Sequence, residues 1–442
     1  MERSLVFLVP PEFKGENQGL YIQHIASMQW LLDRAAGWRM EVMDLSNPRL
    51  EEVSAAADLI VVHMLDHMRA EGVIRRRRAA GLPTVFEITD NFLDLGPWLP
   101  KRHRLRSPLV RQRILYHAWL CDAAQVYARP LARLFESVNR KIAVLDPYVP
   151  IADEEPDPPL EGGPLVLGWA GTTSHESDLA RIAPAVVEFC RRRPDSIFAF
   201  MGDESLFQRH FAALAPGQTR VRPFSPYEDF LAFVRSWDLG LAPLGREGFN
   251  NGRSDTKFAT YAACGVAPLL ERHPVHAPHE GTGLLFDGAA GLTTLLERLY
   301  ADRGLARKAG RRSHAWARRE RGADRLREQR IRFYESLAPR GSAPAQPPGR
   351  DIPGMEAAVH GSALDRLRRD HRSWERRVDF FREMLRHQPY DYIALRALIA
   401  ECEAGGGDQA ELDSLYKRLC LVAPEAVPDR RRPPSLRDFL PA

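Results

Sequence analysis

The segment NNGRSDTKFATYAACGVAPLL (residues 250–270) follows the apolar run DLGLAPL (238–244) and ends in an apolar run of its own. Between the two runs, Ser254 or Asp255 offers an N-cap for a helix, and Gly265 is placed to end that helix. A strand, a helix and a second strand in this order form a βαβ unit, whose strands lie parallel in one sheet. The segment therefore predicts a parallel α/β domain.

The start of this helix is rich in positive charge. A helix N-terminus at the carboxyl edge of a parallel sheet binds anions, because free backbone N–H groups and the helix dipole point toward the ligand. Arg253 and Lys257 flank this terminus, so we expect a phosphate or diphosphate there. The alternative is that both cations only pair with Asp255 or Glu247 on the surface.

The helix has two distinct faces. Lys257, Thr260 and Cys264 share one face by their spacing, whereas Phe258 and Tyr261 lie toward the other and can pack on the sheet. Thr260 is therefore expected to face the ligand, one turn above Lys257.

The same alternation of apolar strands and amphipathic helices runs through most of the chain. It occurs in one tract before residue 149 and in another from residue 165, and such alternation indicates parallel sheets. The predicted fold class is α/β, with two Rossmann-like parallel-sheet domains facing each other across a cleft, plus a small C-terminal helical region. Ligands of such folds bind at the carboxyl ends of the strands.

Proline-rich stretches divide the chain, because segments of this composition do not build a packed core. The expected organisation is an N-terminal acceptor-side domain at 1–149, a linker at 150–164, a second domain at 165–337, a linker at 338–354 and a helical region at 355–442.

The helical region contains two similar stretches, FREMLRHQP (381–389) and YKRLCLVAP (416–424), in which an aromatic residue precedes a proline by eight positions. Tetratricopeptide repeats have a period of about 34 residues and end in this way. One or two degenerate repeats fit this pattern, and so does a generic helical hairpin. Either form would serve packing or a protein partner rather than catalysis.

Composition and charge argue against several classes of protein. The formal net charge is +4 and the Arg-rich stretches also carry Asp and Glu, so no nucleic-acid partner is expected. The five cysteines lack the spacing of a zinc site or a disulfide framework, which favours a reducing cytoplasm. No apolar run reaches the roughly 18 residues of a membrane span, so no transmembrane segment is expected, although peripheral membrane contact stays open.

Five motifs between residues 165 and 286 resemble, in their order, the donor-binding domain of GT-B glycosyltransferases, especially family four. They are LGWAGTTSHESDLARIAP, FAFMGDE, WDLGLAPL, SDTKFATYAACGVAPLL and GTGLLF. The resemblance implies transfer of a sugar from a nucleotide diphosphate sugar to a glycan or other acceptor, without a bound metal or a cofactor. In such enzymes a basic pair stabilises the departing diphosphate, which makes Arg253 and Lys257 the candidate catalytic residues.

The resemblance also implies donor-binding positions in the turns and the helix of this domain. They are Gly171, Thr172, Thr173, Gly202, Asn250, Asn251, Ser254 and Thr260. Family four usually carries two glutamates separated by seven residues, and the corresponding positions here hold Gly252 and Thr260. A threonine cannot hold two ribose hydroxyls as a carboxylate does, so donor binding is expected to be altered, weakened or lost. Glu247 is a nearby carboxylate, but it is out of register.

The acceptor is expected to contact strand ends of the first domain. The candidates are Glu16, Asn17, Gln18, His63, Asp66, Asp90 and Asn91. Those at the later strand ends, His63, Asp66, Asp90 and Asn91, could each be a general base, although each strand end must carry some polar residue. A second hypothesis is a catalytically silent GT-B domain that binds a sugar nucleotide, or a partner protein through residues 355–442.

Overall fold

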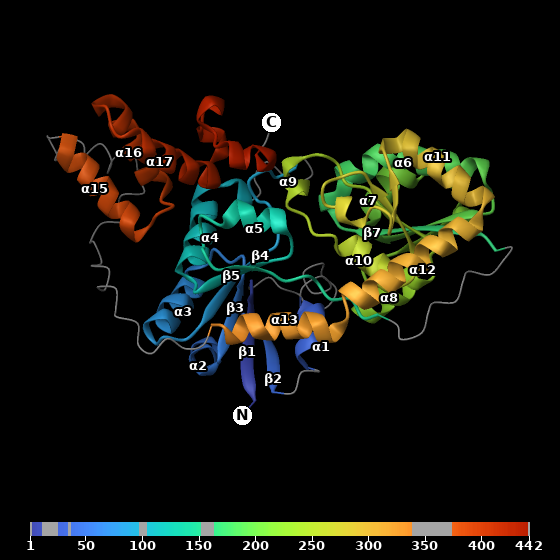
Figure 1. Cartoon of the computed structure of the whole chain (residues 1–442), viewed down its shortest axis with the longest axis horizontal. Coiled ribbons are helices and arrows are strands. Elements are labelled where there is room, and N and C mark those ends of the chain that lie inside the picture. Colours follow the sequence, from blue (N-terminus) through green and yellow to red (C-terminus); the bar gives the residue numbers. More distant parts are fainter. Residues whose placement is uncertain are drawn as a thin grey trace.

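The computed structural model describes residues 2–10, 25–33, 37–96, 104–151, 163–337 and 374–440. The first lobe is built on a parallel sheet (Figure 1). Its strands are β1 (Arg3–Val9), β2 (Trp38–Asp44), β3 (Leu59–His63), β4 (Thr84–Ile88), β5 (Ala123–Val126) and β6 (Ile142–Val144), in the order β2-β1-β3-β4-β5-β6. Residues 5–9 of the central strand β1 are all buried, as expected when helices cover both faces of a parallel sheet.

The second lobe repeats this architecture. Its strands are β7 (Leu165–Gly171), β8 (Ser196–Gly202), β9 (Thr219–Arg222), β10 (Leu239–Ala242), β11 (Ala267–Glu271) and β12 (Leu284–Phe286), in the order β12-β11-β10-β7-β8-β9. The recorded strand pairs of both sheets are parallel; β1 pairs with β2 and β7 with β8 over seven residues each. The two sheets confirm the predicted fold class of two Rossmann-like domains.

Helices connect the strands and cover the sheets. In the first lobe they are α1 (Ala26–Asp33), α2 (Leu50–Ala56), α3 (Met68–Ala79), α4 (Pro108–Leu120) and α5 (Arg129–Phe135). In the second they are α6 (Glu176–Arg192), α7 (Glu204–Phe211), α8 (Tyr227–Arg235), α9 (Gly248–Asn251), α10 (Thr256–Ala263), α11 (Gly288–Ala301) and α12 (Arg303–Glu320). The predicted strand–helix–strand unit around residues 250–270 is confirmed as β10, α10 and β11, with α9 inserted in the loop.

Helix α13 (Ala323–Glu335) crosses back to the first lobe, where Figure 1 shows it in orange beside α1. Tyr334 and Leu337 pack in the same apolar cluster as Trp38 and Leu5 of the first lobe. The Tyr334 hydroxyl also donates a hydrogen bond to Gln125 Oε1 at 3.0 Å. Chain order put this helix in the predicted domain at 165–337, whereas its apolar side chains bury against the first sheet.

The C-terminal helices α15 (Trp374–His387), α16 (Tyr392–Gly405) and α17 (Gln409–Val422) also pack on the first lobe. Leu415 and Leu419 belong to one apolar cluster with Ile114 and Leu115 of α4. These helices are thus an extension of the first lobe. The two matched stretches form the ends of α15 and α17, and their kinship to tetratricopeptide repeats stays a prediction.

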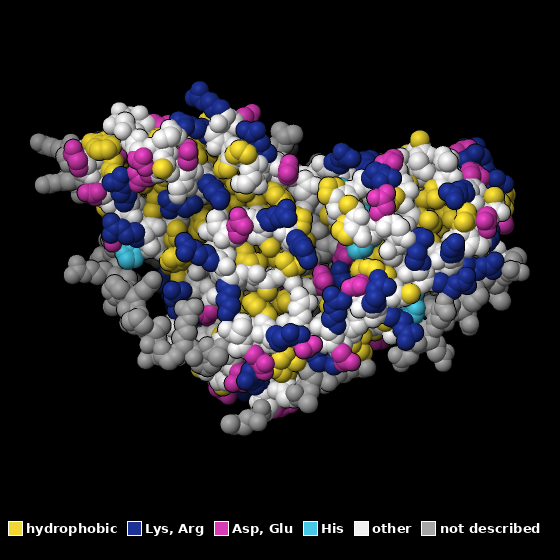
Figure 2. All heavy atoms as spheres, viewed as in Figure 1, with side chains coloured by type: hydrophobic (Ala, Val, Ile, Leu, Met, Phe, Trp, Pro, Cys, Tyr) yellow, Lys and Arg dark blue, Asp and Glu magenta, His cyan; other side chains and the backbone are white. Residues whose placement is uncertain are grey.

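The structure also shows the state of the cysteines and the distribution of charge over the surface. All five cysteines are buried free thiols. On the face in Figure 2, Lys and Arg side chains are interspersed with Asp and Glu over both lobes. In the part of the chain that the structure describes, no helix combines the length and apolarity needed to cross a bilayer.

Candidate functional site

The candidate site lies at the carboxyl ends of β7 and β8. A Cβ atom on Gly202, whose φ is +157°, would lie only 2.4 Å from the Gly171 carbonyl oxygen, so this close approach of the two strand ends excludes a side chain. A Cβ atom on Gly171 would lie 2.8 Å from the Trp169 ring and 3.0 Å from Lys257 Nζ. Glycine at position 171 therefore leaves the space that the lysine ammonium occupies.

Lys257 extends from the first turn of α10 over the end of β7. Its Nζ donates a hydrogen bond to the Ala170 carbonyl and lies 5.0 Å from the centroid of the Trp169 ring, a cation–π geometry. Burial, aided by the charge of Arg253, lowers the pKa of Lys257 to about 7. The ammonium is thus held in place near neutrality but is close to losing its proton.

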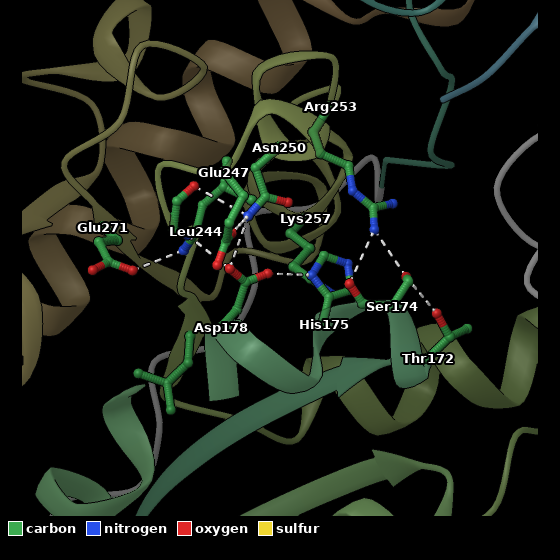
Figure 3. Close-up of polar contacts among 12 residues, drawn as sticks. Thr172, Ser174, His175, Asp178, Leu244, Glu247, Asn250, Arg253, Lys257 and Glu271 are labelled. Carbon is green, nitrogen blue, oxygen red and sulfur yellow. Dashed lines mark hydrogen bonds and ion pairs between the residues drawn. The ribbon is translucent and has the colours of Figure 1, made fainter. Parts of the chain in front are cut away.

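Arg253 reaches the same turn from the loop after α9 (Figure 3). Its Nη2 donates to Ser174 Oγ at 2.8 Å, and its Nη1 lies 3.3 Å from Asp90 Oδ1 of the first lobe. The guanidinium stacks on Phe249 at 4.4 Å from the ring centroid. Its Nε is buried and has no hydrogen-bond acceptor among the described residues.

The alternative that Arg253 and Lys257 pair with Asp255 does not describe this site. Asp255 is the N-cap residue of α10, but its carboxylate accepts from Arg321 Nη2 at 2.7 Å and lies 2.9 Å from His279 Nε2. Burial alone would raise the pKa of Asp255, but Arg321 and His279 lower it to about 2. This ion pair fixes the start of α10, whereas Arg253 pairs with Asp90 and Lys257 bonds to the Ala170 carbonyl.

Asp178 holds the loop that precedes Arg253. This buried carboxylate on α6 accepts hydrogen bonds from the Gly245 amide at 2.7 Å and from Asn250 Nδ2 at 3.0 Å, and it lies 2.9 Å from His175 Nδ1 (Figure 3). Burial and the charges of Lys257 and Arg253 hold the pKa of His175 well below its usual range. Neutral His175 therefore separates the two cations from the buried carboxylate.

Sequence reasoning did not single out Asp178 and His175, although both lie in the quoted stretch TSHESD. Their spacing of three residues at a helix start is the signal that could have found them. Asn250, which we predicted as a donor ligand, instead supports the loop by donating to Asp178 and to Glu247 Oε2 at 2.7 Å.

The remaining donor candidates have different surroundings. Asn251 Nδ2 donates to the Asp438 carbonyl at the far end of the chain. Ser254 Oγ lies 2.6 Å from Thr256 Oγ1, and Thr260 Oγ1 donates to the Thr256 carbonyl at 2.8 Å within α10. Thr172 Oγ1 lies 2.8 Å from Ser174 Oγ in the turn, which also contains Thr173 in a short 3-10 helix.

A pocket with aromatic walls opens beside Lys257. It is open to solvent. Its polar lining includes Thr172, Lys257, Thr256 and Thr260, and its aromatic lining is Tyr148, Phe224, Tyr227, Phe230 and Tyr261. None of these aromatic residues was predicted to line a pocket, and Tyr261 was expected only to pack on the sheet; PFSPYEDF (223–230) after β9 is the sequence signal that was missed. Neither Asn250 nor Asn251 lines this pocket.

The acceptor-side candidates come from the first lobe. His63 at the end of β3 has its Nδ1 2.8 Å from Glu87 Oε1, and fully buried Glu87 also accepts hydrogen bonds from Gln125 and Tyr127. Asp90 contacts Arg253, as described above. Asp66 pairs with Arg104, and Asn91 is buried between segments. Glu16, Asn17 and Gln18 lie outside the described residues. Within the described ranges, no three His, Cys, Asp or Glu side chains gather as a metal site requires.

Comparisons with solved structures reveal the same two-lobed architecture elsewhere. The Anabaena protein HepE, solved in complex with UDP and glucose, matches 76% of this chain and 100% of its own with a TM-score of 0.56 and 13% identity. The chain has the GT-B fold. Sucrose-phosphate synthase from Thermosynechococcus elongatus matches 76% of this chain and 99% of its own, with a TM-score of 0.53 and 14% identity. No protein-family model matches the chain, and no curated protein matches it in sequence. Membership of family four therefore stays a prediction.

Proposed function

We propose that the protein transfers a sugar from a nucleoside diphosphate sugar to a hydroxyl-bearing acceptor, with Lys257 and Arg253 stabilising the diphosphate as it leaves. The observation that carries this proposal is that Lys257 contacts the end of β7 while Arg253 contacts the turn that follows it, and that Gly171, Thr172 and Lys257 line the aromatic pocket. The HepE structure with UDP and glucose, which shares the fold, supports a sugar nucleotide as the ligand.

The chemistry assigns one task to each group. The bond between the anomeric carbon and the diphosphate oxygen breaks, and a bond from that carbon to the acceptor oxygen forms. Negative charge develops on the departing diphosphate, so prepositioned positive charge lowers the barrier, and no metal ion is required in the proposal. The acceptor hydroxyl gives up its proton to a base of the first lobe, for which Asp90 and His63 are the candidates that the structure describes.

The aromatic pocket is proposed to hold the nucleoside. Its aromatic side chains offer surfaces on which a base can stack, and base–aromatic stacking contributes about 1–3 kcal/mol per base. Thr260 lies on this wall. Its hydroxyl proton is donated to the Thr256 carbonyl, so Thr260 can accept a hydrogen bond from a ribose hydroxyl but has no proton left to donate. The nucleoside is therefore held mainly by stacking and the diphosphate mainly by charge.

The test is calorimetric titration of the purified full chain with UDP, GDP, ADP, dTDP and the corresponding sugar nucleotides. Arg253→Ala and Lys257→Ala should each remove binding of the one nucleotide that the wild type selects. Arg332→Ala is the matched control, because Arg332 is an exposed arginine paired with Glu328 on α13. Failure of the wild type to bind any of these ligands would contradict the proposal.

The second hypothesis, a catalytically silent GT-B domain that serves as a scaffold, predicts that no sugar is transferred. Two observations favour keeping it as the second candidate: position 260 holds a threonine whose hydroxyl is already bonded, and Arg253 is paired with Asp90 across the lobes. If a sugar nucleotide binds but release of its nucleoside diphosphate is undetectable with every acceptor class tested, the scaffold is the better description.

A further inference from the structure

The last described residues of the chain return to the loop that carries Arg253. Residues 434–440, which include the 3-10 helix η9 (Pro434–Phe439), form a segment that we name the C-terminal strap. Figure 1 shows the C-terminus beside α9, at the junction of the two lobes. The strap therefore belongs to the first lobe by packing and touches the second lobe at α9.

One amide side chain joins three separate segments at this junction. Asn91, fully buried after β4, donates from Nδ2 to the Gly248 carbonyl of α9 and to the Phe439 carbonyl of the strap, both at 2.8 Å. Its Oδ1 accepts from the Leu93 amide at 3.0 Å, which fixes the amide orientation. Removing either acceptor would leave a buried amide donor of Asn91 unsatisfied, which lowers the stability of the folded protein.

The backbone packing at the junction leaves no space for larger residues. A Cβ atom on Gly252 would lie 2.9 Å from Asn91 Cβ, and one on Gly248 would lie 3.0 Å from the backbone carbon of Phe439. Asn251 adds a hydrogen bond to the Asp438 carbonyl. Phe249 and Phe439 bury their rings in the apolar cluster of the first lobe. Two glycines and two aromatic side chains thus let α9 pack closely between strap and lobe.

We propose that the C-terminal strap is an interdomain latch that holds α9 of the second lobe against Asn91 of the first and thereby positions the loop that carries Arg253. The latch concerns how the strap holds a loop and not how a ligand binds. It therefore goes beyond the proposed function and does not depend on it. Arg253 follows α9 by two residues and contacts Asp90, the neighbour of Asn91. Release of the strap would therefore free both the loop and the contact between the lobes.

The test is hydrogen–deuterium exchange of the full chain and of two variants. Asn91→Asp keeps the acceptor for the Leu93 amide but replaces both donors by a carboxylate that faces two carbonyls. Phe439→Ala removes the apolar anchor of the strap and changes nothing in the second lobe. Arg430→Ala is the control, because Arg430 is exposed in the adjacent 3-10 helix η8 (Asp429–Arg431).

A latch predicts that both variants raise exchange in residues 245–253 and in the strap together. Two lost hydrogen bonds should make this exchange at least about tenfold faster, whereas β7 and β8 should exchange as in the wild type. If Asn91→Asp does not fold, Phe439→Ala carries the test alone, because its substitution lies in a different lobe from the expected effect. The inference is overturned if Phe439→Ala loosens only the strap and leaves residues 245–253 unchanged.

Discussion

The lowered pKa of Lys257 makes the affinity for a nucleoside diphosphate dependent on pH. Burial and Arg253 lower the pKa of this lysine to about 7 in the free protein. A diphosphate binds the charged ammonium better than the neutral amine, so binding takes up a proton once the free lysine has lost it. Affinity should therefore fall as pH rises above 7.

The size of the effect follows from the fraction of Lys257 that is protonated. With a pKa of about 7, roughly half of the free protein carries the charge at pH 7 and roughly 3% at pH 8.5. If only the charged form binds, the dissociation constant rises roughly 16-fold, which is about 1.6 kcal/mol at about 1.36 kcal/mol per tenfold change. A phosphate has its second pKa near 6, so the ligand changes its charge little in this window.

The assay is calorimetric titration with UDP at half-unit steps from pH 7 to 8.5, in two buffers of different ionisation enthalpy. Proton uptake should then appear directly in the difference of heats. Lys257→Arg is the matched control, because an arginine keeps its charge throughout this range and should flatten the profile. If the wild-type affinity for UDP is unchanged from pH 7 to 8.5, or if Lys257→Met shows the same change of affinity with pH, deprotonation of Lys257 does not control binding.

Three further predictions concern a buried ion pair, the packing of the second lobe and stacking in the aromatic pocket. Asp255→Asn removes the nearer carboxylate partner of buried Arg321, which then keeps only Asp146 at 3.4 Å, and should lower the free energy of unfolding in urea titrations by up to about 3–5 kcal/mol. Burial raises the pKa of Asp255, but Arg321 and His279 together lower it to about 2. This contribution is therefore present above about pH 4 and should disappear from the wild type as pH falls toward 2. Gly168→Ala places a Cβ atom 1.8 Å from the Trp237 ring and should cost at least about 1–3 kcal/mol; an unchanged melting temperature would count against the packing described. Tyr227→Ala should weaken UDP binding about tenfold or more by loss of stacking, and equal affinity would remove the nucleoside from the aromatic pocket.

The sequence predicted the sheets well because both lobes bury continuous apolar strands between helices. The run LVFLV and the unit around residues 250–270 could be read locally, since period, caps and glycine all agreed. The packing of α13 against the first lobe could not be predicted, because its apolar face carries no mark of which sheet it covers. Chain order placed it with the helix before it, whereas burial against the first sheet decides its position.

Only part of the candidate site could be predicted, because several of its contacts join residues that are distant in the sequence. Arg253 and Lys257 could be singled out as candidates because their charges stand at a helix start. The contacts of Asn91 with the Gly248 and Phe439 carbonyls join residues that are far apart in the sequence, and no local pattern encodes them. Asn250 resembled a ligand by its place in the loop, but its partner Asp178 lies on another helix, so only the folded chain shows that it supports the loop.

The most direct test of the central claim is a crystal structure of the protein with bound UDP. If Lys257 and Arg253 hold the diphosphate, it should lie within hydrogen-bond distance, about 3 Å, of Lys257 Nζ and of the Arg253 guanidinium, with the uracil ring inside the aromatic pocket. A diphosphate bound elsewhere, with Lys257 still donating only to the Ala170 carbonyl, would contradict the assignment of this site.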